Sequence, residues 1–520
     1  MMKARIIHQL WRWGASSATK KFIYGLKNTK EAQSDRLRNI LYNGRGSIFS
    51  SEHGIGLNTT TAEFRSKVPL RNWEEFRPWT TQVEAGIKNV LSNDPVCRLV
   101  PTSGSSQACK LVPTGVKLVS EFRAALDPWV TGLLNDEPQL AEGCSYWAIS
   151  PPNSFTKNLN SKIPIGFEDD AAYFGPLASL VSILQAVPKC VANEKSTFLF
   201  KQRTLSYLLR RHDLCFVSIW HPSFFELLLS HLRENWESLL HIVTNGNPEW
   251  NGILRHGDSI RAKALRNFGP RVSLIWPKLS VISAWCHGSS EGPSKALSEL
   301  IPAAKIISKG VVATEGVVSI PWSGKHPLAI TSHFLEFLDE AGNVRCADEI
   351  EIKKRYEVII TTSGGLWRYR TGDIIEVDGF IAETPSIRFL GRQGGVVDLC
   401  GEKLNEIHVT KCLESLNKIL RPAVWRMIVP APDGKGYLLL LDESILDEVT
   451  VVELLEQQLL ENPHYEFARN LGQLRKIEVK VVPTGARIRV IENLVANGHQ
   501  LGATKLPILN ARTDWVELLS

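Results

Sequence analysis

The sequence predicts an α/β protein in which a large N-terminal domain with mixed sheets and helices precedes a small α+β C-terminal domain. Strand and helix patterns alternate from about residue 279 onwards, which favours an α/β architecture. The pattern starts afresh after residue 404, which indicates a second folding unit. With 520 residues, 43% of them hydrophobic and 22% charged, the chain has the length and balance of a globular protein of two or more domains.

The N-terminal part begins with helical spacing and then turns to strands. Apolar residues such as Ile7, Leu10 and Trp11 recur at helical intervals, which predicts helix over residues 1–45. A strand over 96–100, a loop rich in serine and glycine, and a second strand over 110–112 follow. Residues 200–243 carry aromatic and leucine-rich faces and are predicted to be helical.

The rest of the chain divides at a cluster of glycines. Strands are predicted over 279–285, 305–307, 317–320, 333–338 and 356–361, with a helix opening at Pro293. After residue 404 come a helix (409–420), a strand, a turn at 433–434, a strand (437–441), a helix (451–460) and a strand (476–482). Glycines at 391–395 lower the cost of the backbone changes that a hinge needs. We therefore predict an N-terminal domain over 1–393, a hinge over 394–403 and a small mobile domain over 404–520.

Charge and cysteine content exclude several classes of protein. The net charge of +6, from 60 basic and 54 acidic side chains, includes no long Lys/Arg run, so nucleic acid is not a predicted partner. The modest positive field suits an anionic small substrate. The nine cysteines have no C-x-x-C spacing, so neither a zinc site nor a disulfide framework is indicated, and their thiols favour a cytoplasmic location.

Membrane and oligomer signals are weak. No window of the sequence approaches the roughly 18 apolar residues that a membrane span requires. Residues 5–13 fit a short amphipathic helix, which is expected to pack on its own domain; contact with a membrane surface or a partner is the alternative. A monomer is favoured because no coiled coil or apolar repeat is present.

The first segment with chemical character is the loop between the first two strands. Small hydroxyl residues around a glycine let backbone N–H groups and hydroxyls converge on an anion, and a lysine adds a positive charge. It is not a Walker loop, because G-x-x-x-x-G-K-[ST] occurs nowhere in the chain. A plain hairpin turn is the alternative. The residues concerned are Thr102, Ser103, Gly104, Ser105, Ser106 and Lys110.

Two carboxylates lie in segments suited to a nucleotide. Glu315 ends an apolar strand in Thr-Glu-Gly, where it can hold a magnesium ion that bridges phosphates; a helix cap or a solvated side chain is the alternative. Asp373 follows a glycine and precedes a strand, where it can accept both hydroxyls of a ribose; a structural Arg–Asp pair is the alternative. Arg392, in the glycine cluster, offers a guanidinium to phosphate or ribose.

These segments in this order, followed by a small C-terminal domain, resemble the adenylate-forming superfamily, which includes acyl-CoA synthetases, nonribosomal adenylation domains and luciferases. The chain is more closely similar to the auxin-responsive acyl-acid amido synthetases of the Gretchen Hagen type, particularly their bacterial members. The resemblance runs over nearly the whole chain. Its family-specific segments are Ser-Ile-Trp-His-Pro-Ser-Phe-Phe at 218–225 and Thr-Thr-Ser-Gly-Gly-Leu-Trp-Arg-Tyr-Arg-Thr-Gly-Asp at 361–373.

The resemblance implies roles for individual residues. The loop over 102–106 and Lys110 would bind phosphates, and Thr314 with Glu315 would meet the adenylate phosphate and Mg²⁺. Lys505 would be the mobile catalytic lysine, which neutralises charge as the carboxylate attacks the α-phosphate. The other nucleotide contacts would be Ser289 beside the adenine, Asp373 on the ribose with Tyr369 nearby, and Arg392. A wall of the acyl pocket would comprise Trp220, Ser223, Phe224 and Leu227.

The chain departs from related sequences in three places. Ile508 and Leu509 follow Lys-Leu-Pro where related chains often carry an arginine, and Gly394 stands where the wider superfamily often has an acidic hinge residue. The phosphate loop has Gln-Ala-Cys at 107–109 in place of a second glycine before its lysine. None of these departures removes a group that the chemistry requires.

The resemblance therefore implies an AMP-forming ligase that uses ATP and Mg²⁺ to adenylate a carboxylic acid and transfers the acyl group to an amine, with an amino acid as the expected acceptor. The alternatives are an acyl-CoA or acyl-carrier-protein ligase that shares the adenylation step, and a noncatalytic nucleotide-binding homologue. Trp220, Phe224 and Phe225 favour an apolar or aromatic acid. His326 and His333 are conceivable proton acceptors for the amine, and a structural role is the expected one for both.

One motif points to a different reaction. Residues 288–292, Gly-Ser-Ser-Glu-Gly, fit the G-x-S-x-G nucleophile elbow of serine hydrolases, with Ser290 as the nucleophile. Such short matches are common, and the order of elements of an α/β-hydrolase is absent from the sequence. A hydrolase is therefore not the predicted function.

Overall fold

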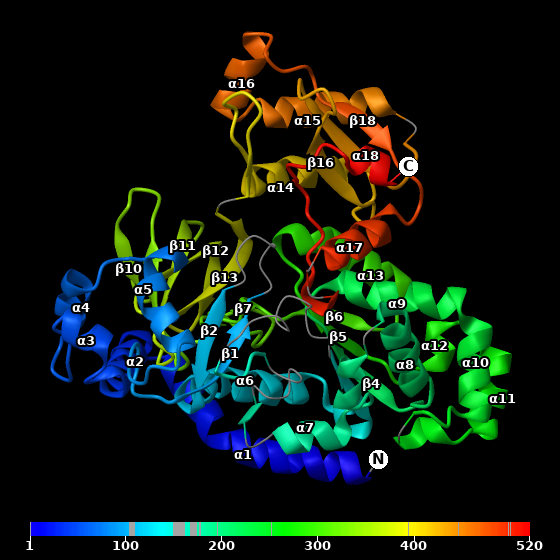
Figure 1. Cartoon of the computed structure of the whole chain (residues 1–520), viewed down its shortest axis with the longest axis horizontal. Helices are drawn as coiled ribbons and strands as arrows, with labels where there is room; N and C mark the ends of the chain where they lie inside the picture. Colours follow the sequence, from blue (N-terminus) through cyan, green and yellow to red (C-terminus); the bar gives the residue numbers. More distant parts are fainter. Residues whose placement is uncertain are drawn as a thin grey trace.

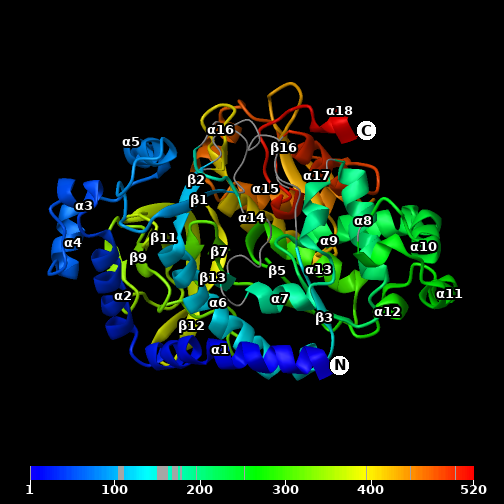
Figure 2. The ribbon, with the colours of Figure 1, turned by 60° about the horizontal axis from the view of Figure 1, so that its bottom comes forward.

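The computed structural model describes residues 2–102, 110–148, 162–166, 174–175, 178–194, 196–250, 252–393, 395–445, 447–497, 499 and 501–519. In Figure 1 a broad N-terminal part, blue to yellow-green, lies below a smaller C-terminal part, dark yellow to red. The long helix α1 (Met2–Leu26) runs along the base, as Figure 2 shows from a second direction. Among the described residues, no helix is both long and apolar enough to cross a membrane.

The larger sheet of the N-terminal part is antiparallel, with the strand order β10-β9-β11-β12-β13. Buried and half-exposed residues alternate along the first half of β12, the pattern of a strand with one face towards the core. The register of β12 on β13 places Asp373 opposite Arg392, so the sheet joins two predicted site residues. The strands are β9 (Phe334–Leu338), β10 (Val344–Cys346), β11 (Arg355–Thr361), β12 (Tyr369–Ile381) and β13 (Thr384–Arg392).

The second sheet is parallel, with the order β3-β4-β5-β6, and its first three strands are fully buried. Its strands are β3 (Cys144–Trp147), β4 (Leu214–Ser218), β5 (Val281–Ala284) and β6 (Lys305–Ser308). Strand β4 corrects the prediction that residues 200–243 are helical, because it separates α8 (Thr197–Leu209) from α9 (Pro222–Glu234). A short buried apolar run has no period that distinguishes strand from helix.

Several helices lie between the strands of this sheet in the chain. The structure gives α10 (Trp236–Asn245), η5 (Gly252–Arg255), α11 (Ser259–Phe268), α12 (Val272–Ile275), η6 (Gly288–Ser290) and α13 (Glu291–Leu300). The strand predicted over 317–320 is shorter: β8 (Gly316–Val317) pairs with β7 (Val312–Ala313), and beyond it Ser319 makes only an isolated bridge. The strands expected over 333–338 and 356–361 are confirmed as β9 and β11.

The N-terminal helices and the first hairpin agree with the sequence prediction. Helix α2 (Thr29–Gly44) follows α1, and β1 (Val96–Pro101) pairs antiparallel with β2 (Leu111–Gly115). Capping boxes start two of the short helices, since Thr60 and Glu63, and likewise Asn72 and Glu75, exchange side-chain and backbone hydrogen bonds. The remaining elements are α3 (Ile48–Glu52), α4 (Thr61–Lys67), α5 (Trp73–Glu84), α6 (Val116–Asp136), η1 (Pro138–Glu142), α7 (Ala178–Leu184) and η4 (Lys189–Asn193).

The C-terminal part is built on a three-stranded sheet of order β16-β17-β18, whose first pair is antiparallel and second pair parallel. Helices α16, α17 and α18 were not predicted from the sequence. The elements are β14 (Val396–Val397), β15 (Leu404–Asn405), α14 (Glu406–Ser415), η7 (Leu416–Lys418), β16 (Arg426–Pro430), β17 (Tyr437–Leu441), α15 (Glu448–Leu459), α16 (Pro463–Asn470), β18 (Glu478–Val481), α17 (Ala486–Ala496), η8 (Leu501–Ala503) and α18 (Trp515–Leu519).

The two parts of the chain share a hydrophobic core. Val490 and Ile491 of α17 belong to the same buried cluster as Leu228 of α9, whereas the face of the C-terminal sheet beneath α14 and α15 has a core of its own. An ion pair adds to this contact, since Arg487 Nε lies 3.4 Å from Glu226 Oε2. The orientation of the C-terminal part is therefore fixed by apolar burial as well as by charge.

Candidate active site

An Asp–Arg pair stands at the centre of the site because β12 and β13 bring the two residues opposite each other. Arg392 Nε lies 3.1 Å from Asp373 Oδ1, and the aspartate is 7% exposed. The carboxylate of Asp373, with that of Glu315 farther away, raises the pKa of Arg392 above its usual range. Each member of the pair could also bind a ligand: the carboxylate of Asp373 could accept hydrogen bonds from hydroxyls, and the guanidinium of Arg392 could donate to an anion.

Glu315 reaches the same place from a separate hairpin. It lies in the two-residue turn between β7 and β8, next to the half-buried Thr314, and is 4% exposed. Its Oε1 lies 3.9 Å from Arg392 Nη2 and has no hydrogen-bond partner in the described part of the chain. A buried carboxylate oxygen without a partner is costly unless a cation or a donor meets it. This oxygen fits a magnesium ion held by one protein carboxylate and by substrate phosphates.

Lys110 lies directly before β2, the second strand of the first hairpin. Its Nζ donates a hydrogen bond to Tyr369 Oη at 2.9 Å, and the backbone of Thr102 donates to its carbonyl, also at 2.9 Å. Burial lowers the pKa of Lys110, while the carboxylates of Glu315 and Asp373 oppose that shift. Tyr369, which is fully buried, thus positions the lysine. The other predicted loop residues, Ser103, Gly104, Ser105 and Ser106, lie outside the described residues.

Lys505 comes to the site from the C-terminal part, about 110 residues after Arg392 in the sequence. Its Nζ lies 4.7 Å from the ring centre of Trp285 and 5.3 Å from that of Phe389. The side chain keeps exposed surface, yet the surrounding protein lowers the pKa of its ammonium, and the nearby carboxylate of Asp373 opposes this shift. The structure therefore brings a mobile-lysine candidate to the Asp–Arg pair.

Ser289 links the two parts of the chain at the same place. It lies in η6, directly after β5, and is 9% exposed. Its side chain hydrogen-bonds with Glu406, the first residue of α14, whose pKa is raised by burial although Lys505 opposes the shift. Gly288 allows the close approach, since a Cβ there would lie 3.0 Å from the carbonyl oxygen of Leu390. The predicted adenine loop thus meets the C-terminal part directly.

The neighbouring Ser290 does not form a hydrolase centre. It is 2% exposed, and no histidine hydrogen-bonds to its hydroxyl within the part of the chain that the structure describes. Ser290 is the last residue of η6, directly before α13, and its backbone N–H donates to the carbonyl of His287. A nucleophile needs both access and a base, so the G-x-S-x-G match carries no site.

The predicted acyl-pocket residues divide into two groups. Trp220 is partly exposed, and its ring centre lies 5.3 Å from that of Trp285, beside Lys505. Phe224 and Leu227 are each 1% exposed and lie in the core cluster that contains α8, α9 and α17. Ser223 is buried too, with its Oγ 2.5 Å from His221 Nδ1. In this structure only Trp220 of the four faces the reaction centre.

Four histidines bear on the question of which group accepts the proton of the amine. His333 is fully buried and lies 3.1 Å from Glu121 Oε2, which gives it a structural role. His326 stacks edge-on against His287, with ring centres 5.0 Å apart, and burial lowers the pKa values of both. His221, which sequence reasoning missed, has a pKa lowered to about 3 by burial and by Lys505, so it is neutral in this state.

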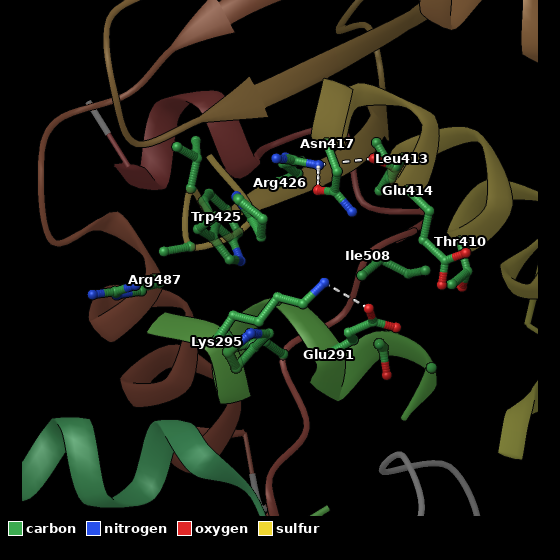
Figure 3. A pocket seen from close by; sticks show the side chains of 18 of the residues that line it. Glu291, Lys295, Thr410, Leu413, Glu414, Asn417, Trp425, Arg426, Arg487 and Ile508 are labelled. Atoms are coloured by element: carbon green, nitrogen blue, oxygen red, sulfur yellow. Dashed lines mark hydrogen bonds and ion pairs between the residues drawn. The ribbon is translucent and has the colours of Figure 1, made fainter. Parts of the chain in front are cut away.

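A pocket of about 680 Å³, counted to its open mouth, lies between α13 and the C-terminal part (Figure 3). Lys295 and Glu291 form its floor, with Lys295 Nζ 2.7 Å from Glu291 Oε1, while Trp425 and Arg426 stand on the opposite side in Figure 3. Leu506, next to Lys505 in sequence, also lines it. The pocket therefore belongs to the seam between the two parts and would change if they turned relative to each other.

The fold is that of the adenylate-forming ligases. Solved structures agree on the fold: an acyl acid amido synthetase in complex with 2,4-DB superposes with a TM-score of 0.83 at 18% identity, over 97% of this chain and 95% of that one. A 2-hydroxyisobutyryl-CoA ligase in a postadenylation state gives 0.50 at 14% identity, over 88% and 86%.

The chain belongs to the GH3 family, whose N-terminal domain matches residues 18–306, central domain residues 326–392 and C-terminal domain residues 433–514. An indole-3-acetic acid-amido synthetase of Arabidopsis thaliana is 22% identical over 96% of this chain and 92% of its own length. A jasmonoyl-L-amino acid synthetase of Nicotiana attenuata is 19% identical over 96% and 95%. The resemblance found in the sequence motifs is confirmed.

Proposed function

We propose that this chain joins a carboxylic acid to the amine of an amino acid, with ATP converted to AMP and pyrophosphate through an acyl-adenylate. The observation that carries the proposal is the convergence of Glu315, Asp373, Arg392 and Lys505 from three separate segments, with Lys110 behind Tyr369. Amido synthetases among the relatives support an amino acid as the acceptor. A monomer in the cytoplasm is part of the same proposal.

In the first half-reaction, a carboxylate oxygen of the acid attacks the α-phosphorus of ATP, and the bond to the bridging oxygen of pyrophosphate breaks. Asp373 would hold the ribose hydroxyls, and Arg392 would steady Asp373 and a nearby oxygen of the nucleotide. Lys110 and the loop over 102–106 would bind the phosphates, and Lys505 would offset the charge that builds at the α-phosphate. Magnesium held at Glu315 would supply further charge neutralisation on the phosphates.

In the second half-reaction, the amine nitrogen attacks the acyl carbonyl, AMP leaves with the bonding electron pair, and the amine loses a proton. Lys505 is not needed for this acyl transfer. Its movement away from the site would open the seam between the two parts of the chain beside Ser289. The segment over 394–403 would act as the hinge for residues 404–520. That turn must break the apolar contact between α17 and α9, so it is expected to be driven by the change of ligand.

The test is pyrophosphate release from ATP with a panel of carboxylic acids, each with and without a pool of amino acids. Glu315→Ala, Asp373→Ala and Lys505→Ala proteins would be measured beside the unaltered chain. Acid-dependent release that rises with amino acids and collapses in the variants supports the proposal. Consumption of coenzyme A or a carrier protein without amide product would instead identify a thioester ligase, and failure of the folded protein to bind ATP would identify a noncatalytic homologue.

A further inference from the structure

The carboxyl ends of the four parallel strands converge on one edge of their sheet, where ligands bind in open α/β folds. Strand β3 ends at Trp147 and β4 ends at Ser218, two residues before Trp220. Strand β5 is followed by Trp285, and β6 by Lys309. This edge therefore carries three tryptophans and a lysine.

Lys309 is 5% exposed and is enclosed by aromatic rings. Its Nζ lies 5.0 Å from the ring centre of Trp129 in α6, 5.2 Å from that of Trp220 and 5.8 Å from that of Trp147. The same Nζ donates a hydrogen bond to Ser218 Oγ at 2.5 Å. Because indole rings exclude water, an oxygen acceptor that reaches this ammonium would be bound far more strongly than at the surface.

A second donor belongs to one of the rings that enclose Lys309. Trp129 is 5% exposed, and its indole Nε1 has no hydrogen-bond acceptor among the residues that the structure describes. Buried tryptophan N–H groups usually find an acceptor, so one without a partner indicates that something other than these residues supplies it. The ammonium of Lys309 beside this ring makes the place selective for an oxygen atom.

The enclosed lysine is connected to the reaction centre by a line of aromatic rings. Lys505 Nζ lies over Trp285, and the ring centre of Trp285 lies 5.3 Å from that of Trp220, which in turn borders Lys309. Trp220 and Trp285 are partly exposed, whereas Trp129 and Lys309 are buried. The tryptophans thus connect Lys505, which keeps exposed surface, with the buried Lys309.

We propose that Lys309 and Trp129 determine the acid that this enzyme accepts: an aromatic carboxylic acid with an oxygen acceptor at the end remote from its reacting carboxylate. The inference rests on the proposed adenylation of an acid beside Lys505. The ring of the acid would lie against Trp220 and Trp285, whose own rings are in contact with each other, and its remote oxygen would accept hydrogen bonds from Lys309 Nζ and Trp129 Nε1. Phe224 and Leu227, in the core, would take no part.

The experiment compares pairs of acids that differ only in the remote substituent: para-hydroxybenzoate with para-methylbenzoate, and para-hydroxyphenylpropanoate with para-methylphenylpropanoate. Acid-dependent ATP–pyrophosphate exchange gives kcat/KM for each acid, and quenching of tryptophan fluorescence gives its Kd without ATP. The variants are Lys309→Met, Lys309→Arg and Trp129→Phe. Lys305→Met is the matched control, because Lys305 begins the same strand, is 64% exposed and pairs with Glu137 at the opposite end.

The unaltered enzyme is expected to prefer the hydroxyl member of at least one pair. Lys309→Met should lower kcat/KM for that acid by about tenfold to a hundredfold, and Trp129→Phe by about threefold to tenfold, while the methyl analogue changes less than about twofold. Lys309→Arg, which keeps the charge, should retain part of the preference. Lys305→Met should leave all values unchanged.

No preference in the unaltered enzyme, or an equal loss for both members of a pair in Lys309→Met, would overturn the assignment. If Lys309→Met does not fold, which a thermal melt detects, Trp129→Phe decides by the same ratio. If ATP binds but no acid supports exchange, the proposed function fails, and the assignment then stands or falls on the fluorescence Kd values alone: a hydroxyl preference that the variants abolish would sustain it.

Discussion

Replacement of Lys505 by methionine should separate the two half-reactions. The ammonium lies beside Trp285 and Phe389, within the electrostatic influence of Asp373, and in the proposed function it would face the place where phosphate charge develops. A preorganised group of this kind contributes about 3 to 4 kcal/mol to a transition state, or roughly a hundredfold to a thousandfold in rate. Because the side chain keeps exposed surface, we expect the lower end, about a hundredfold.

Two assays distinguish the half-reactions of Lys505→Met. ATP–pyrophosphate exchange measures adenylation, and amide formation from a chemically prepared acyl-adenylate measures acyl transfer. The rate of adenylation should fall about a hundredfold. The rate of acyl transfer should change by less than about threefold, because Lys505 takes no part in the release of AMP. Lys411→Met is the control, since Lys411 is 58% exposed and pairs with Glu461 on another face. Equal losses in both assays, or none in the first, would refute the assigned role.

The lowered pKa of Lys505 adds a pH signature to the same prediction. Adenylation requires the ammonium form, so its rate should fall as the pH rises through a pKa that lies below the ordinary value of 10.5. Lys505→Arg, whose guanidinium keeps its charge over this range, should lose that alkaline decline. An unchanged alkaline limb in the arginine variant would show that another group is responsible.

Three further predictions concern buried carboxylates. Glu315→Gln should raise the Mg²⁺ concentration for half-maximal adenylation by at least about tenfold, measured by metal titration of exchange; an unchanged midpoint would place the metal elsewhere. Burial raises the pKa of Glu226 from 4.5 to about 6, so the folded state holds this proton more tightly than the unfolded chain. The free energy of unfolding should therefore fall by about 2 kcal/mol as the pH rises from about 4.5 to 6. Glu226→Gln should remove that slope in denaturant titrations at several pH values. Glu121→Leu should cost about 3 to 5 kcal/mol of stability, because Arg36 and the Ser363 hydroxyl lose a 3%-exposed partner; a loss under about 1 kcal/mol in urea would contradict this.

Sequence patterns were sufficient where the signal is local. The hairpin of β1 and β2, the inner strands β9 and β11 of the antiparallel sheet, and α14, β17 and α15 of the C-terminal part followed from periodicity and turn residues. They were insufficient for β4, where the buried run Leu214–Ser218 has no polar face to mark it as a strand. Helix α17 was also missed, although it is the element that holds the C-terminal part to α9.

For the site, motif order gave Glu315, Asp373 and Arg392, whose strand-end positions are visible in the sequence. The same reasoning also predicted Phe224 and Leu227 as pocket residues, but these two side chains lie in the core. The sequence of a helix shows which residues are apolar, but it does not show which apolar side faces a ligand. Lys309 and Trp129 carry no motif. Only the folded chain brings Lys309, directly after β6, to Trp129 in the middle of α6.

The sequence by itself thus determined the class of fold, the order of the nucleotide-binding segments and the family, since these depend on short stretches of neighbouring residues. The tertiary structure decided that aromatic rings enclose Lys309 and that Lys505 lies within the electrostatic influence of the Asp–Arg pair. The physical reason is that these features depend on which side chains lose water together, and residues more than a hundred positions apart are buried jointly only in the folded chain.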